Sequence, residues 1–133
     1  MALINKNHPQ IIEGRTGRNL IYLTITDKRI FFTKAAALVY GLKAGKYLQF
    51  INEGAEWFFY QDDNTDGFSL LEDGKKNGAV QMINASLVRM IRKSLKLSGK
   101  KKFFFAPADH NRNGAKLFEI YTHKSYEEIM KEV

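Results

Sequence analysis

The side chains with the clearest chemical potential in this sequence are cations at helical spacing. Residues three and four apart share one face of a helix, and like charges at that spacing repel one another. A helix that keeps several of them is typical of a surface that neutralises phosphate groups. These cations are Arg89, Arg92, Lys93 and Lys96, followed beyond a glycine by Lys100, Lys101 and Lys102.

Charge is divided unevenly along the chain, which has 133 residues and a formal net charge of +7. Residues 84–104 contain seven cations and no acid, whereas residues 52–74 contain seven acids and no cation. The sequence therefore predicts a nucleic-acid-binding protein, with DNA as the expected ligand, that contacts phosphates through a cationic helix face. Four further cations are expected to join this surface: Arg15, Arg18, Lys28 and Arg29.

No arrangement typical of an enzyme or a metal site is found in the sequence. There is no cysteine, and the three histidines are far apart. Residues 62–67 match the start of a calcium-binding loop, but the twelfth position is Asp73 where a glutamate is usual, and residues 57–60 predict a strand where a helix is required. We therefore expect no metal, no cofactor and no catalysis, and an exposed loop without an ion.

Two alternatives to nucleic-acid binding stay open. The acidic segment, residues 53–73, can dock on a basic surface of a second copy or of a protein partner, which would make the chain a structural or interaction module that self-associates as a homodimer. Its carboxylates can instead form the site of a small enzyme. Salt dependence separates nucleic-acid binding from the interaction module, because phosphate contacts weaken steeply as counterions are restored.

The elements that position these residues are predicted to form one domain spanning residues 1–133. Helices are predicted at 34–40, at 85–97 and from Ser125 to the end, with Thr33 and Asn84 as caps of the first two. These elements predict an α+β fold with antiparallel sheets or a small barrel and a short C-terminal helix. The strands are predicted at 20–26, 29–32, 47–51, 55–61, 68–71, 79–83, 102–107 and 116–122, and a polar turn at 109–114.

Two apolar groups beside the cations have predicted roles. The helix at 85–97 is expected to bury one side in the core, formed by Leu87, Val88, Met90, Ile91, Leu95 and Leu97. Residues 103–105 are three phenylalanines that can offer stacking platforms for single-stranded nucleic acid. Because strand residues alternate between faces, we expect at least two of the three rings to enter the core instead.

The order of strand, polar cap, helix, leucine-to-glycine connection and hairpin occurs twice, in residues 29–61 and 79–122, which predicts an internal repeat. In the first copy, Leu42-Lys43-Ala44-Gly45-Lys46 leads into an alternating strand. This copy resembles the AbrB, SpoVT and MazE group, although Thr33 stands at the usual proline and Lys46 at the usual acid. The resemblance implies a swapped-hairpin barrel, usually built from two chains, that binds DNA through basic residues near the hairpin. A duplicated chain would supply both halves.

The location of the protein is predicted from the absence of two signals. No apolar run approaches the roughly 20 residues that a membrane-spanning helix needs. The N-terminal residues show no charged region followed by an apolar one, so no secretory signal is visible. We expect a cytoplasmic protein without a membrane partner.

Overall fold

The computed structural model describes residues 21–73, 78–112 and 114–132, and its elements follow one another as two similar groups. The first group comprises β1 (Tyr22–Ile25), β2 (Arg29–Phe32), α2 (Lys34–Tyr40), β3 (Tyr47–Glu53) and β4 (Glu56–Asp62). The second comprises β5 (Phe68–Glu72), β6 (Val80–Ile83), α3 (Ala85–Leu95), β7 (Lys101–Arg112) and β8 (Ala115–Ile120). The helix α4 (Tyr126–Glu132) follows.

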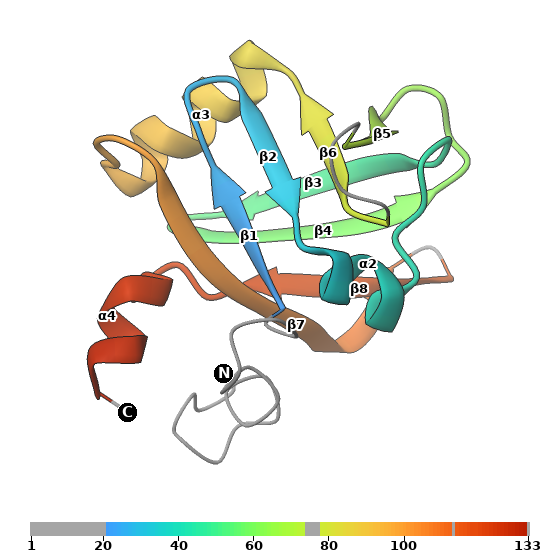
Figure 1. The fold of residues 1–133 in the computed structure, drawn as a ribbon. Coiled ribbons are helices and arrows are strands. Elements are labelled where there is room, and N and C mark those ends of the chain that lie inside the picture. Colours follow the sequence, from blue (N-terminus) through green and yellow to red (C-terminus); the bar gives the residue numbers. More distant parts are fainter. Residues whose placement is uncertain (1–20, 74–77, 113, 133) are drawn as a thin grey trace.

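The eight strands form a closed antiparallel barrel in the order β1-β2-β6-β5-β3-β4-β8-β7 (Figure 1). This confirms the predicted small barrel, although the fold is richer in strand than the α+β class suggested. Exchanging β1 with β5, β2 with β6, β3 with β7 and β4 with β8 leaves every neighbour in the barrel unchanged. The two groups therefore share one strand order, as a duplication of residues 29–61 and 79–122 requires, and the duplication itself stays a prediction.

Aromatic side chains fill the interior of the barrel, as side chains do in barrels of eight strands. Phe59 is fully buried, and its ring centroid lies 5.2 to 5.7 Å from the centroids of four other rings. These rings belong to Phe32, Phe50, Phe105 and Phe118. Because the rings come from both groups of strands, the core belongs to the whole chain and to neither group alone.

The helices α2 and α3 leave the barrel at opposite ends, since α2 follows β2, α3 follows β6, and β2 and β6 are antiparallel neighbours. At the α2 end, the ring of Tyr40 packs on Phe105 and Phe118, with centroids 5.4 and 5.0 Å apart. At the other end, the cap predicted for α3 is confirmed, because the Asn84 side chain accepts a 2.9 Å hydrogen bond from the backbone N–H of Leu87. The cap predicted at Thr33 is likewise present.

Three details of the predicted elements differ from the structure. The helix α3 ends at Leu95 because Lys96 adopts a left-handed conformation with φ 54°. Met90, predicted to lie in the core, is 62% exposed, since the helix buries a narrower stripe formed by Leu87, Val88 and Ile91. The turn predicted at 109–114 is shorter than expected: after a register shift beyond Pro107, β7 and β8 pair again at Asn111 and Lys116, so the chain reverses only between Arg112 and Ala115.

The last helix, α4, covers the outer side of β7. A smaller cluster forms there from Phe104, Ala106, Tyr121 and Ile129. The predicted capping box is present: the backbone N–H and the hydroxyl of Ser125 both donate to Glu128, and these bonds lower the pKa of that carboxyl. Within the described residues, no helix is long and apolar enough to cross a membrane.

We predict that Phe59→Ala lowers the free energy of unfolding by about 3 to 5 kcal/mol, because it leaves a cavity among four rings. The matched control is Phe58→Ala, one residue away on the outer, partly exposed side of β4, with an expected loss of about 1 kcal/mol. Urea unfolding followed by the fluorescence of Trp57 measures both. Equal losses would contradict the packing described for the barrel interior.

The buried Tyr121 predicts a pH dependence of stability. Burial, reinforced by nearby Glu119, raises the pKa of Tyr121 to about 12. An unfolded chain ionises tyrosine near pH ~10. The stabilisation that the neutral Tyr121 side chain contributes is therefore complete below that pH. It is lost as the pH rises towards about 12, the pKa of Tyr121 in the folded protein. Unfolding midpoints across this window should fall more steeply for the wild type than for Tyr121→Phe, and parallel curves would refute the assignment.

Candidate nucleic-acid interface

The helix α3 carries the predicted cations on the side that faces away from the core. Its buried stripe, formed by Leu87, Val88 and Ile91, fixes the helix against the barrel, where α3 contacts β2. On the opposite side Arg89, Lys93 and Lys96 are exposed, whereas Arg92 is partly buried. The apolar face thus determines how the cations are presented to solvent.

The turn between β1 and β2 lies directly against α3. Its backbone carbonyl at Lys28 accepts a 3.0 Å hydrogen bond from the N–H of Asn84, the cap of the helix. The hydroxyl of Thr26 shapes the turn by accepting from the N–H groups of Lys28 and Arg29, at 3.4 and 3.0 Å. Sequence reasoning missed this role of Thr26, although a threonine followed by Asp27 is a typical turn signal.

The guanidinium of Arg92 connects three parts of the chain. Its Nη1 donates to the carbonyl of Thr26 at 3.2 Å and to the carbonyl of Gly99 at 2.6 Å. The side chain therefore joins α3 to the β1–β2 turn and to the segment that leads into β7. These contacts make Arg92 a structural residue, and we leave it out of the phosphate-binding set predicted from the sequence.

The remaining predicted cations do not all lie beside α3. Lys102 Nζ lies 5.1 Å from the ring centroid of Tyr22 and 5.4 Å from that of Tyr126, at the α4 side of the barrel. Lys101 is partly buried on the same strand. Arg15 and Arg18 lie outside the described residues. We define the α3 cationic surface by its exposed members, which are Lys28, Arg89, Lys93, Lys96 and Lys100.

The α3 cationic surface has no acidic partner in the part of the chain that the structure describes. The ion pair found there joins Lys46 Nζ to Asp63 Oδ1 at 2.6 Å, in the loop after β4. This pair holds the loop to the segment between α2 and β3, to which Gln61 of β4 is also bonded. The charges of the surface are therefore left to solvent or to a ligand.

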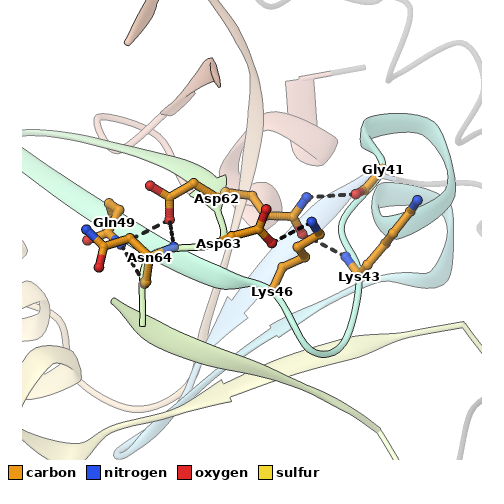
Figure 2. A network of polar contacts seen from close by, with 8 residues as sticks. Gly41, Lys43, Lys46, Gln49, Asp62, Asp63 and Asn64 are labelled. Atoms are coloured by element: carbon orange, nitrogen blue, oxygen red, sulfur yellow. Dashed lines mark hydrogen bonds and ion pairs between the residues drawn. The ribbon is translucent and has the colours of Figure 1, made fainter. Parts of the chain in front are cut away.

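The predicted calcium-like loop, residues 62–67, uses its polar groups to hold its own shape (Figure 2). Asp62 Oδ1 accepts from the N–H of Asn64 and from the side-chain amide of Gln49, both at 3.1 Å. The Gln61 side chain donates to the carbonyl of Gly41 and accepts from the N–H of Lys43. No cluster of three or more metal-ligating side chains occurs among the described residues.

The expectation that at least two of the three rings at residues 103–105 enter the core is confirmed, because all three are buried and none offers a stacking platform. Phe103 and Phe105 belong to the main core, whereas Phe104 packs in the cluster under α4. Both sides of β7 are thus covered at this point. A run of three aromatic residues is typical of a strand that is buried on both faces.

Comparisons of the chain with protein-family models, with curated proteins and with solved structures find no match. Function is therefore inferred from geometry and charge.

We predict that Arg92→Ala lowers the free energy of unfolding by about 1 to 2 kcal/mol, because two carbonyls lose a charged donor. Arg89→Ala removes the same charge from an exposed site on the same helix and should change stability by no more than about 0.5 kcal/mol. Urea denaturation of both variants measures the difference. A loss at Arg89 as large as that at Arg92 would show that charge, and not the bridge, is responsible.

Proposed function

We propose that this protein binds nucleic acid by placing phosphates on the α3 cationic surface. The observation that carries the proposal is that five exposed cations from the β1–β2 turn, from α3 and from the segment after it meet at one end of the barrel. No ion pair in the described part of the chain neutralises them. Nucleic-acid phosphates are the common biological polyanion that such a surface attracts.

The helix dipole accounts for only part of this charge. Cations in the last turn of a helix are favourable because they face its negative end, and Arg92 and Lys93 lie in that turn. Arg89 is placed further from the C-terminus, and Lys28 is on a different element. The dipole therefore does not explain why these two cations are kept close to the others, whereas a phosphate backbone would contact all of them.

Together with this function, we propose that the chain consists of a duplicated unit of the AbrB, SpoVT and MazE type. The shared strand order of the two groups and the placement of one helix at each end of the barrel support this proposal. The two ends differ in chemistry, since α2 exposes Leu38 and Val39 where α3 exposes cations. We infer that only the α3 end of the barrel contacts phosphates.

The test is fluorescence anisotropy with labelled oligonucleotides over a range of salt concentrations. For duplex DNA, three or four phosphate contacts give a slope of log affinity against log salt of about −3 to −4. The triple variant Arg89→Gln, Lys93→Gln and Lys96→Gln should reduce this slope by about 2 to 3, since each lost contact removes about 0.9. Arg92 is kept so that the fold is preserved.

The matched control is Lys34→Gln, Lys43→Gln and Lys116→Gln, which removes the same charge from exposed positions away from α3. This variant should keep the wild-type slope within about 0.5. Equal effects of the two triple variants would show that net charge, and not this surface, attracts the ligand. Absence of binding by the wild type at low salt would reject nucleic-acid binding and favour the protein-interaction module.

A further inference from the structure

The outer face of β2 and β6 lies beside the α3 cationic surface and is left uncovered by the described helices in Figure 1. The outer side of β1 is covered in part by α4, since the rings of Tyr22 and Tyr126 lie 4.9 Å apart and Thr24 is buried. The pairing registers define which outward residues lie side by side across this face. Thr24 pairs with Phe31, and Phe31 pairs with Gln81. At the two sides of this row, Thr24 pairs with Lys102 of β7 and Gln81 with Leu71 of β5.

Phe31 is the aromatic residue at the centre of this row. The neighbours Ile30 and Phe32 point into the core, so the alternation of the strand turns Phe31 outward, where it is partly exposed. Phe32 packs against two other rings, whereas Phe31 packs against no ring among the described residues. Further along the paired strands are Leu71, beyond Gln81, and Ile83, opposite Arg29, each 44% exposed. Phe31 is therefore a partly exposed ring on a strand that is paired on both sides.

The same face carries positive charge close to this ring. Arg29, two residues before Phe31, shares its face and is held across the sheet by a 3.4 Å contact from Nη1 to Gln81 Oε1. Neither the row through Phe31 nor the paired residues Arg29 and Ile83 include an acid. Hydrogen bonds from α3 to the β1–β2 turn make this face continuous with the α3 cationic surface.

We propose that this face binds single-stranded nucleic acid, with one base stacked on Phe31 and the adjacent phosphates on Arg29 and the α3 cationic surface. The inference rests on the proposed function and narrows its ligand. Aromatic rings within a cationic surface are the features by which proteins hold single strands, since every base offers a face for stacking. In a duplex both faces of an internal base are already stacked, so Phe31 has no base face to contact.

The experiment compares three labelled ligands by anisotropy: an oligothymidine of about 15 nucleotides, a duplex of equal length, and an abasic oligonucleotide with the same number of phosphates. The wild type should bind the oligothymidine more tightly than the abasic ligand. Phe31→Leu should weaken oligothymidine binding at least about fivefold, because stacking on one ring is lost. Binding of the abasic ligand should be unchanged, since no charge is altered.

Two further variants make the result specific. Phe58→Leu changes a partly exposed, outward ring on β4 in the same way and should leave all three affinities unchanged. Phe31→Trp keeps a stacking surface, so it should retain oligothymidine binding, with fluorescence quenched by the oligothymidine and not by the abasic ligand.

The outcomes separate this inference from the proposed function. If Phe31→Leu binds oligothymidine as the wild type does, while the α3 triple variant still shows the reduced slope of log affinity against log salt, the proposed phosphate surface stands and the proposed stacking on Phe31 is overturned. A wild type that prefers the duplex to oligothymidine overturns the single-strand inference as well. If no ligand binds at low salt, the proposed function itself has failed.

Discussion

The whole structure depends on the way in which the two groups of strands interlock. Each group contributes two hairpins, β1–β2 and β3–β4 from the first, β5–β6 and β7–β8 from the second. Around the barrel, the two hairpins of one group are separated on both sides by a hairpin of the other. Neither group therefore builds a sheet of more than two strands, and isolated two-stranded hairpins are at best marginally stable in water.

This interlocking also explains how a surface of like charges is kept in place. The helix α3 belongs to the second group but is bound to both hairpins of the first, since the indole N–H of Trp57 in β4 donates to the hydroxyl of Ser94 at 3.1 Å, and Arg92 reaches the β1–β2 turn. Repulsion between neighbouring cations costs a few tenths of a kcal/mol per pair. Buried apolar contacts of the helix exceed that cost by far, at roughly 1.5 to 3 kcal/mol for each large side chain.

The elements were predicted largely correctly from the sequence, because strand composition and polar caps are local signals. The caps Asn84 and Ser125 illustrate this, since each lies within three residues of the group that it contacts. The contacts of Arg92 were not predictable, because its partner Thr26 lies 66 residues away and the closure of the barrel brings them together. Spacing alone therefore did not separate Arg92, which bridges parts of the chain, from the exposed cations, whose phosphate contacts stay a prediction.

The aromatic residues show the same limit. Phe103, Phe104 and Phe105 form a run of three rings beside the lysines, yet the barrel and α4 bury all three. Phe31 lies in a strand of four residues, and the burial of its neighbours Ile30 and Phe32 places it on the outer face, in register with Thr24 and Gln81. Composition indicates which rings are present, whereas burial decides which of them a ligand can reach.

The alternation of hairpins has a consequence for synthesis on the ribosome. The first group emerges with Phe32 and Phe59 already made, but rings that cover them, Phe105 and Phe118, belong to the last quarter of the chain. Nearly the full length must therefore leave the exit tunnel before the core can close. Until then the nascent chain exposes apolar surface and unpaired strand edges, which is the condition under which chaperones engage newly made proteins.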